Sequence, residues 1–331
     1  MSLQLPRFAM GTAPIGNLYS AVSDEAAEAT VAAALTSGIR YFDTAPYYGF
    51  GLAERRLGAA LEAHDAAGEA IVSTKVGRRL EPVDHPARER HGFVDGDPFA
   101  PVFDYGYDAV LQSHEESIKR LRRGRVEILL AHDLGALTHG SEAERHMGAF
   151  LDGGYRAMVE LKQGGAIDAI GVGVNETAVV EHLLERVDLD VVLIAGRYTL
   201  LDQRAAERLL PICAAKGVKV IVGGPYNSGI LAQRGIARAE MRYDYVAATA
   251  EVVARAEAIE QLCERFGVPI PAAALQFPSR HPAVDCVVAG LGSEREIGEA
   301  VERLATPIGE ELWQALEEQG LVRSGAGTVR A

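Results

Sequence analysis

The chain has 331 residues, of which 48% are apolar and 24% charged, and its formal charge at pH 7 is −13. These values are typical of a folded globular protein, and the length is compatible with one large domain. The negative charge argues against a surface for nucleic acid or anionic membranes. No apolar run approaches the roughly 20 residues that span a bilayer. The N-terminus lacks a basic patch followed by an apolar core, so no secretion signal is expected.

The cysteines are too few and too widely spaced for a disulfide framework or a CxxC metal site. They are Cys213, Cys263 and Cys286, each in an apolar or amphipathic stretch. We interpret them as buried structural thiols. Such thiols fit a reducing compartment, so we expect a cytoplasmic protein.

Strand-like and helix-like segments alternate along the whole chain. The first predicted helix covers 23–38, with Ser23 as N-cap, acidic residues in the first turn and Gly38 as the stop. The strand-like segments are mostly continuous apolar runs, which are typical of a parallel sheet buried on both faces. Strands are expected at 5–12, 38–44, 70–77, 126–133, 167–175, 190–198, 218–224 and 283–292. Further helices are expected at 52–64, 108–124, 155–165, 176–187, 208–217, 253–267, 293–305 and 309–320.

Eight βα units over this length predict a (β/α)₈ TIM barrel, with the whole chain, 1–331, as one domain. The longer segments 79–106, 135–153 and 231–248 each follow a strand, so they are expected as long loops at the C-terminal mouth. A doubly wound sheet is the competing architecture, but it normally carries a GxGxxG motif after its first strand. The chain has no such motif there, and the barrel is preferred.

Four reactive side chains lie where predicted strands end. Asp43 ends the second strand and Tyr48 follows it, while Lys75 and His132 end the third and fourth. The carboxyl ends of barrel strands open onto one mouth, so these groups are expected to converge. An ammonium group there would lower the pKa of the phenol, a carboxylate would keep the ammonium charged, and a neutral imidazole could hydrogen-bond a substrate oxygen. Such a set moves a proton while a hydride moves elsewhere.

Over nearly its whole length the chain resembles the aldo-keto reductase superfamily. The matching segments are GIRYFDTAPYYGFGLAERRLGAAL, IVSTKVG, EESIKRL, ILLAHD and GVGVN. The resemblance implies that Asp43, Tyr48, Lys75 and His132 form the catalytic tetrad of that family, with Tyr48 as general acid/base. Three further segments, MGTAPIGNLY, AGRYTLLDQ and VIVGGPYNSGIL, resemble the sugar and pyridoxal dehydrogenases within the family.

The narrower resemblance implies oxidation of an aldose, L-fucose-like or D-threo, at C1 to a lactone. A pyridoxal 4-dehydrogenase or a general aldehyde reductase is the alternative. Tyr47 and Phe50 are expected near the reacting carbon, with 79–106 and 231–248 as the outer wall of the substrate site. The Arg and Tyr side chains of 231–248 suit a polyol or a pyridine ring better than a wholly apolar substrate. The oligomeric state stays open.

The resemblance also implies an extended NAD(P) cofactor across the barrel mouth. Asn175 would hold the nicotinamide carboxamide, and Gly11 and Thr12 would lie near the nicotinamide ribose. The pyrophosphate would contact Gly224, Tyr226 and Ser228. The adenosine end would contact Gly290, Gly292 and Glu296, where a helix N-terminus suits anions.

Some positions depart from the family pattern. Gly223 stands where many members stack an aromatic ring on the nicotinamide, and Ala195 stands where many have glutamine. At the adenosine end, Gly290 and Glu296 align with the lysine and arginine that grip a 2′-phosphate in NADP-dependent members. A carboxylate there repels a phosphate and can accept a ribose hydroxyl, so NAD is expected, with NADP as the alternative. Arg295 is adjacent, and a shift of one residue in the alignment reverses this inference.

Two other classes of function stay open. A metal-dependent barrel hydrolase could use His132, Asp133, His85 and His91 as ligands, although their spacing is not one that metal sites commonly use, and no metal is predicted. A non-catalytic module could sense a nicotinamide cofactor within a larger assembly, which the complete tetrad disfavours. Each tetrad residue taken singly has an ordinary structural explanation, so the prediction depends on the convergence of all four.

Overall fold

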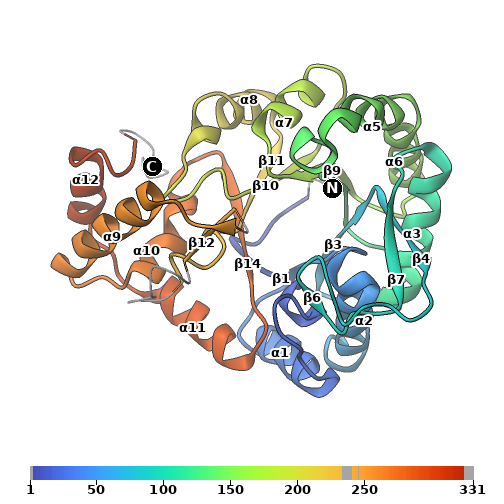
Figure 1. The fold of residues 1–331 in the computed structure, drawn as a ribbon, viewed down its shortest axis with the longest axis horizontal. Coiled ribbons are helices and arrows are strands. Elements are labelled where there is room, and N and C mark those ends of the chain that lie inside the picture. Colours follow the sequence, from blue (N-terminus) through green and yellow to red (C-terminus); the bar gives the residue numbers. More distant parts are fainter. Residues whose placement is uncertain (1–2, 233–240, 245, 324–331) are drawn as a thin grey trace.

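Eight parallel strands close into a barrel in the computed structural model, which describes residues 3–232, 241–244 and 246–323. Neighbouring strands pair in the order β1-β14-β11-β10-β9-β8-β3-β2. The predicted (β/α)₈ barrel is confirmed, and Figure 1 shows the helices as a ring around it. The barrel strands are β1 (Phe8–Gly11), β2 (Tyr41–Asp43), β3 (Ile71–Val76), β8 (Ile128–His132), β9 (Ala169–Val174), β10 (Val191–Ala195), β11 (Lys219–Gly223) and β14 (Val284–Gly290).

Side chains along the barrel strands point alternately into the barrel and toward the surrounding helices. Ile128 and Leu130 of β8 fill the interior together with Val191 and Leu193 of β10. Leu129, between the first two, belongs instead to the larger core between sheet and helices. Because both faces of these strands are buried in apolar surroundings, the sequence shows continuous apolar runs.

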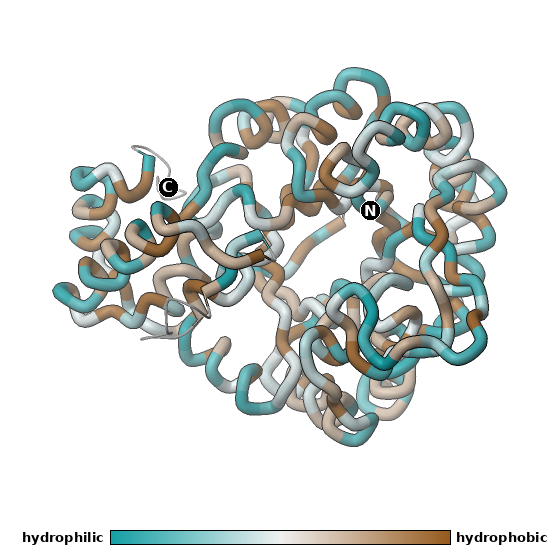
Figure 2. Tube along the Cα trace, in the orientation of Figure 1, coloured by the Kyte–Doolittle hydropathy of each residue, from teal (hydrophilic) through white to brown (hydrophobic). Residues whose placement is uncertain are grey.

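The outer helices begin and end at recognisable signals. At the start of α1, the Ser23 hydroxyl accepts a hydrogen bond from the Ala26 amide, and Asp24 and Glu25 occupy the first turn, where acidic groups are favourable. Figure 2 shows teal and brown alternating along the helices, as amphipathic packing requires. The helices are α1 (Asp24–Thr36), α2 (Leu52–His64), α3 (Tyr107–Leu121), α6 (Tyr155–Gln163), α7 (Thr177–Leu184), α8 (Leu209–Lys216), α9 (Ala250–Arg265), α10 (Ile270–Gln276), α11 (Glu294–Ala305) and α12 (Glu310–Glu318).

Long connections follow β3, β8 and β11, as predicted, but they are more ordered than simple loops. The first pairs β4 (Arg78–Pro82) with β7 (Phe99–Phe103) and β5 (Glu89–Arg90) with β6 (Phe93–Val94). The second is helical. Its elements are α4 (Ala136–His139), η3 (Gly140–Glu142), α5 (Ala143–Ala149) and the π-helical η4 (Phe150–Gly154). The third contains β12 (Arg242–Tyr243) and β13 (Val246–Ala247), and part of the predicted 231–248 lies outside the described residues.

Further short helices lie between these elements in the described residues. They are η1 (Pro14–Gly16), η2 (Tyr48–Gly51), η5 (Arg204–Ala206) and η7 (Phe277–Arg280). In the part of the chain that the structure describes, no helix is long and apolar enough to cross a membrane.

The ends of the barrel strands divide the mouth into two chemically different parts. On β2, β3 and β8 the last inward positions carry Asp43, Lys75 and His132, each two residues beyond an interior position of the same strand. On four other strands the corresponding residues are small, and they pair in register as Gly11 with Gly290 and Ala195 with Gly223. The mouth therefore places reactive groups beside a strip almost free of side chains.

Candidate active site

Lys75 lies between Asp43 and Tyr48 at the mouth of the barrel. Its Nζ atom donates hydrogen bonds to Oδ2 of Asp43 at 2.8 Å, to the backbone oxygen of Thr44 at 2.8 Å and to the Tyr48 hydroxyl at 3.2 Å. Lys75 and Asp43 are only 2% and 3% exposed. Three acceptors use the full hydrogen-bonding capacity of an ammonium group. This one amine therefore brings three of the four predicted catalytic residues into contact.

Neighbouring strands hold the Asp43 carboxylate in position. The Ser73 hydroxyl donates to Oδ1 of Asp43 at 2.7 Å, and the Tyr41 hydroxyl donates to Ser73 at 3.0 Å. Both carboxylate oxygens therefore have a partner, which a buried charge requires. The backbone oxygen of Asp43 accepts from the amide and the hydroxyl of Thr12 at 2.9 and 3.0 Å. Thr12, predicted near the cofactor, is itself fully buried in this supporting role.

Tyr48 reaches Lys75 from a turn and not from a barrel strand. It opens η2, in which Gly49 and Phe50 have positive φ angles of 63° and 59°. A Cβ atom at Gly49 would lie 2.4 Å from the backbone oxygen of Gly16, so this turn needs glycine. Phe93, from the connection after β3, packs against the Tyr48 ring with 6.4 Å between ring centroids. Local backbone geometry and a long connection together position the phenol.

Burial and charge act in opposite directions on the Tyr48 phenol. Burial raises its pKa above the ordinary value and Lys75 lowers it, and the net pKa is raised. The sequence predicted a lowered pKa for Tyr48 and correctly identified Lys75 as the cause. It did not account for burial, whose effect on the pKa is larger than that of Lys75. For Lys75, burial lowers the pKa, but Asp43 and Tyr48 together raise it by more, so the net pKa is above the ordinary value. At neutral pH the free protein therefore carries a charged Lys75 beside a protonated Tyr48.

His132 joins the group from the end of β8. Its ring meets the rings of Tyr47 and Tyr48 edge to face, with centroid distances of 6.2 and 6.0 Å. Burial, reinforced by Arg78 and Lys75, holds the pKa of His132 well below its usual range. The imidazole is therefore neutral near pH 7, a form that can donate one N–H to an oxygen without bringing a charge.

Aromatic side chains form the wall beside Tyr48. Tyr47 is half-buried, and its ring lies 5.6 Å from that of Phe93 and 3.9 Å from the guanidinium carbon of Arg78. Phe50, expected to contact the substrate, is fully buried and packs against Tyr47 and Phe93 at 6.1 and 5.7 Å. Tyr47 can therefore offer its surface to a substrate, whereas Phe50 supports Tyr47.

The strip of small residues fits a long, flat ligand. Gly11 and Gly290 are paired in register, and a Cβ atom at Gly290 would lie 3.3 Å from Pro14. Gly224 follows β11 with a φ of 63° and is exposed. Ser228 has a φ of 60°, and Asn227 and Gly229 on either side of it also have positive φ angles, so the segment after β11 turns sharply. Gly224 and Gly290 are exposed, whereas Gly11 and Gly223 are buried, so the backbone is accessible at part of this strip, as the approach of a pyrophosphate would require.

Other residues predicted at the cofactor lie around this strip. Asn175 directly follows β9, and its backbone oxygen accepts a 2.6 Å hydrogen bond from Nε of Arg197. Arg197, which the sequence analysis did not consider, is 4% exposed and also donates to Asp244 at 2.8 Å. The Tyr226 hydroxyl accepts from Nη1 of Arg303 at 3.2 Å, which places a cation beside the predicted pyrophosphate contact.

Glu296, expected at the adenosine end, also caps a helix. The Ser293 hydroxyl accepts from the Glu296 amide at 3.2 Å, and Oε2 of Glu296 accepts from the Gly292 amide at 2.7 Å. This is a form of the capping box, which the spacing S-x-x-E signals in a sequence. Arg295 is 72% exposed and pairs with Glu299. The structure therefore gives Glu296 and Arg295 local roles within α11 besides any contact with a cofactor.

The residues considered for a metal site lie in other contacts. Asp133 is bonded to Arg78, and the His91 ring packs against Tyr47 at 6.0 Å. Among the described residues there is no group of three or more His, Cys, Asp or Glu side chains that could hold a metal ion. Asp133 directly follows β8, and Arg78 lies two residues beyond the end of β3, so its position near a strand end could have indicated Arg78 in the sequence.

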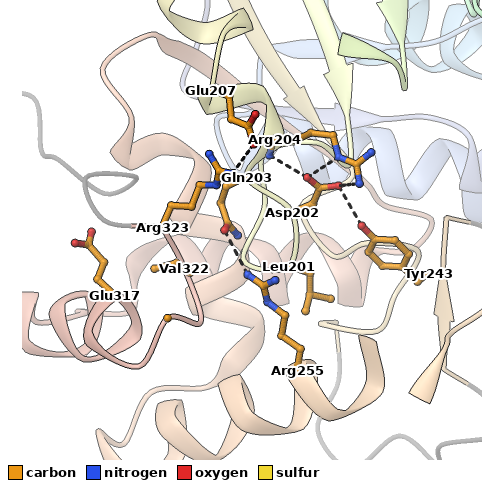
Figure 3. A pocket seen from close by; sticks show the side chains of 11 residues that line it. Leu201, Asp202, Gln203, Arg204, Glu207, Tyr243, Arg255, Glu317, Val322 and Arg323 are labelled. Carbon is orange, nitrogen blue, oxygen red and sulfur yellow. Dashed lines mark hydrogen bonds and ion pairs between the residues drawn. The ribbon is translucent and has the colours of Figure 1, made fainter. Parts of the chain in front are cut away.

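A separate pocket of about 590 Å³ lies between the segment after β10 and the C-terminal part of the described chain (Figure 3). Asp202 in its wall is bonded to Arg204 at 2.8 Å and to the Tyr243 hydroxyl at 3.2 Å. Arg255 donates to Gln203 at 3.5 Å. These polar groups are bonded to one another. None of the four tetrad residues lines this pocket. It therefore contributes no group to the chemistry at the barrel mouth.

Several proteins similar in sequence to this chain are named dehydrogenases. It is 40% identical to a pyridoxal 4-dehydrogenase from Microbacterium luteolum and 36% identical to a D-threo-aldose 1-dehydrogenase from a Pseudomonas species. Each match covers 97% of this chain and 95% of the relative. An L-galactose dehydrogenase from Arabidopsis thaliana is 29% identical, with 90% of this chain and 84% of that protein covered.

Solved structures agree on the fold. An aldo-keto reductase from Bacillus halodurans in its holo form matches with a TM-score of 0.74 at 24% identity, covering 98% of this chain and 93% of that one. A glycerol dehydrogenase from Gluconobacter oxydans matches with a TM-score of 0.73 at 21% identity, covering 98% and 94%. The sequence model of the aldo/keto reductase family matches residues 7–320. The chain therefore belongs to the aldo/keto reductase family and is an NAD(P)-dependent oxidoreductase.

Proposed function

We propose that this protein uses NAD to oxidise the cyclic hemiacetal of an aldose, L-fucose-like or D-threo, at C1 to a lactone. Asp43, Lys75, Tyr48 and His132 are the catalytic residues. The observation that carries the proposal is the continuous contact from Asp43 through Lys75 to the Tyr48 hydroxyl, beside a neutral His132. The whole chain acts as one catalytic domain, and the buried cysteines suit a cytoplasmic location.

The four residues divide the work of moving one proton. A bound NAD would supply the acceptor for the hydride of C1. The Tyr48 phenolate takes the proton of the C1 hydroxyl, and the carbon–oxygen bond becomes the lactone carbonyl. Lys75 stabilises the phenolate, and Asp43 keeps Lys75 charged in its buried position. His132 donates a hydrogen bond to the reacting oxygen, which holds it within reach of Tyr48.

Pyridoxal is the alternative substrate, supported by the 40% identity to a pyridoxal 4-dehydrogenase. In water pyridoxal closes through its own hydroxymethyl group to a cyclic hemiacetal, so its oxidation to a lactone changes the same bonds. Tyr47 and Phe93 present aromatic surfaces suited to a pyridine ring or to the C–H face of a sugar. The shared element is the cyclic hemiacetal, and the pattern of its polar groups distinguishes the two substrates.

NAD is preferred over NADP because the carboxylate of Glu296 lies at the predicted adenosine end. A 2′-phosphate there would meet a negative charge, whereas a ribose hydroxyl could donate to it. Gly290, the other position expected to carry a cation in NADP-dependent members, has no side chain. Asn175, Gly11, Gly224, Tyr226, Ser228 and Gly292 are the further residues proposed to hold the cofactor.

A substrate screen tests the proposal. The purified protein is assayed with NAD and with NADP against L-fucose, a D-threo aldose, pyridoxal and a hydrophobic aldehyde, following the absorbance of the reduced cofactor. We expect oxidation of the hemiacetal substrates with NAD and a lactone as product. Efficient reduction of the hydrophobic aldehyde without aldose or pyridoxal oxidation would contradict the substrate class. Tight cofactor binding without any turnover would instead indicate a sensing module.

A further inference from the structure

Arg78 and Asp133 form an ion pair against the ring of His132, and the mechanism above uses neither. We propose that both are positioning residues for His132. The Asp133 carboxylate selects the neutral imidazole that carries its hydrogen on Nε2, and Arg78 stops that carboxylate from drawing a second proton onto the ring. The inference rests on the proposed role of His132 as the hydrogen-bond donor to the substrate oxygen.

The three side chains meet in a largely buried corner of the mouth. Nη2 of Arg78 donates to Oδ2 of Asp133, and the same oxygen lies 3.5 Å from Nε2 of His132. Arg78 is 6% exposed and His132 7%. The guanidinium carbon of Arg78 also lies 3.9 Å from the centroid of the Tyr47 ring. Arg78 is therefore held by an anion and by an aromatic face, and one carboxylate oxygen faces both Arg78 and the imidazole.

The backbone around His132 is anchored so that this corner persists. Asp133 has a φ of 49°, a left-handed conformation that aspartate tolerates better than most residues. The Asp133 amide donates to the backbone oxygen of Gly173 at 2.9 Å. The Tyr105 hydroxyl donates to the backbone oxygen of His132 at 2.6 Å, and Nε2 of His139 lies 2.9 Å from the same hydroxyl. Tyr105 is fully buried, so a fixed support lies behind the ring.

The surroundings of the ring favour one of its two neutral forms. Nε2 lies 3.5 Å from the Asp133 carboxylate without a hydrogen bond between them. A hydrogen on Nε2 is therefore favoured by the nearby anion yet stays available to the substrate oxygen, whereas a bare Nε2 would set a lone pair against that carboxylate oxygen. On the other side, Nδ1 of His132 is buried with no hydrogen-bond partner in the described part of the chain. A hydrogen on Nδ1 would be an orphaned buried donor, which folded proteins avoid more strictly than an orphaned acceptor. Both nitrogens therefore point to the same tautomer.

A carboxylate this close to an imidazole would, if unpaired, favour the imidazolium ion. Arg78 balances that charge. The titratable and charged groups facing the ring are Lys75 from β3, Arg78 from β4, Tyr47 and Tyr48 from around η2, and Asp133 from its own segment. Burial, Arg78 and Lys75 all lower the pKa of His132. Burial, the largest influence, and Glu176 raise the pKa of Asp133 above its ordinary value, although Arg78 and Lys75 lower it. The pair thus directs the imidazole hydrogen without charging the ring.

Nitrogen-15 signals of the histidine rings test this without cofactor or substrate. The protein has nine histidines, and the His132 signals are those lost in a His132→Gln variant. In the wild type we expect one neutral form, with hydrogen on Nε2, across about pH 5 to 8, the range in which histidine normally titrates. Arg78→Gln leaves Asp133 unpaired, so His132 should titrate inside this range. Adding Asp133→Asn to Arg78→Gln should return the ring to its neutral form.

Activity provides a second readout. In Arg78→Gln, kcat/KM should fall by a further factor of about ten for each pH unit below the new titration of His132, in addition to the dependence set by Tyr48, and the double variant should lose only this additional fall. Arg78→Lys keeps the charge and should keep the ring neutral, which controls for the loss of side-chain volume. Asp133→Asn alone should leave the ring neutral and add the tautomer with hydrogen on Nδ1 as a minor form, because the unpartnered Nδ1 still disfavours that hydrogen.

Either of two results overturns the inference: a wild-type ring with its hydrogen on Nδ1, or an Arg78→Gln ring that stays neutral across the range. If Arg78→Gln does not fold, the wild-type and Asp133→Asn spectra still decide whether Asp133 selects the tautomer, and Asp133→Asn spectra unchanged from the wild type would refute it. Ring signals as expected in a protein that oxidises no hemiacetal would contradict the proposed function and leave the role of this pair intact.

Discussion

The ammonium of Lys75 donates a hydrogen bond of 3.2 Å to the hydroxyl of Tyr48, across 27 positions of sequence. Nζ of Lys75 also lies 4.7 Å from the centroid of the Tyr48 ring. The contact couples the two charge states, because a phenolate beside an ammonium is stabilised and a phenolate without one is not. The proton transfer proposed for Tyr48 therefore depends on the pair, and it can be tested at either residue.

Tyr48→Phe tests the acid/base directly. The substitution keeps the ring but removes the group that exchanges the proton, so kcat should fall by roughly 10²–10⁴-fold. Cofactor affinity, measured by fluorescence titration, should change little. Tyr47→Phe is the matched control, because Tyr47 is the adjacent tyrosine and no hydrogen bond joins it to Lys75 in the structure. Comparable losses in both variants would show that the position of the proton donor is misassigned.

The pH dependence of turnover should differ between the two reaction directions. The pKa of Tyr48 is raised, chiefly by burial, so the phenolate that oxidation requires becomes more abundant as pH increases. Oxidation should therefore accelerate toward alkaline pH, while reduction, which uses the neutral phenol, should slow. Because Lys75 lowers the pKa of Tyr48, Lys75→Met should displace the oxidation profile to still higher pH. An unchanged profile in Lys75→Met would refute the coupling.

Asp43→Asn should destabilise the fold as well as the reaction. It leaves the Lys75 ammonium, 2% exposed, without its counter-charge, and breaking a buried ion pair in this way costs about 3–5 kcal/mol. Urea unfolding of the cofactor-free protein measures the loss. Ser73→Ala is the comparison, since it removes only one neutral donor to Asp43 and should cost about 1–3 kcal/mol.

The same ion pair predicts how stability depends on alkaline pH. Burial lowers the pKa of Lys75, but Asp43 and Tyr48 raise it above the ordinary value. A raised lysine pKa stabilises the fold fully below the unfolded value of about 10.4, and this stabilisation disappears as pH rises through the folded value. Wild-type stability should therefore fall in that alkaline range more steeply than the stability of Asp43→Asn. Parallel curves for the two proteins would contradict the buried pairing.

Strand-end residues could be predicted because a parallel barrel has a simple rule. Asp43 and His132 end apolar strands and Lys75 lies one residue before the end of β3, and alternation along each strand puts them on the interior side. Their convergence needed only the strand count and the common mouth. The short span from Asp43 to Tyr48 likewise kept the phenol within reach of that mouth.

Contacts made by the long connections could not be predicted. Phe93 reaches the Tyr48 ring from a two-stranded element after β3, and no periodicity in 79–106 indicates where that element folds back. The net direction of the Tyr48 pKa shift could not be predicted either, because the burial that raises this pKa depends on packing around the mouth and not on the nearest charge. The cap formed by Glu296, in contrast, was predictable, because the S-x-x-E spacing that indicates it is present in the sequence.

Because Glu296 also caps α11, substitutions at this position can be tested for both cofactor preference and stability. The wild type should have a higher kcat/KM with NAD than with NADP, because a 2′-phosphate would lie near the Glu296 carboxylate. Glu296→Arg should improve the use of NADP, with each tenfold change equal to about 1.4 kcal/mol. It also removes the acceptor of the Gly292 amide, so a loss of about 0.5–2 kcal/mol in stability should accompany the change.

Glu296→Gln separates the charge from the cap. Its amide oxygen can still accept from the Gly292 amide, so stability should stay close to that of the wild type, while the negative charge is gone. If charge repulsion excludes NADP, Glu296→Gln alone should raise kcat/KM for NADP and leave that for NAD nearly unchanged. Arg295→Ala serves as the counterpart at the adjacent exposed position. A wild-type enzyme that prefers NADP, and loses that preference in Arg295→Ala, would place Arg295 and not Glu296 at the 2′ position.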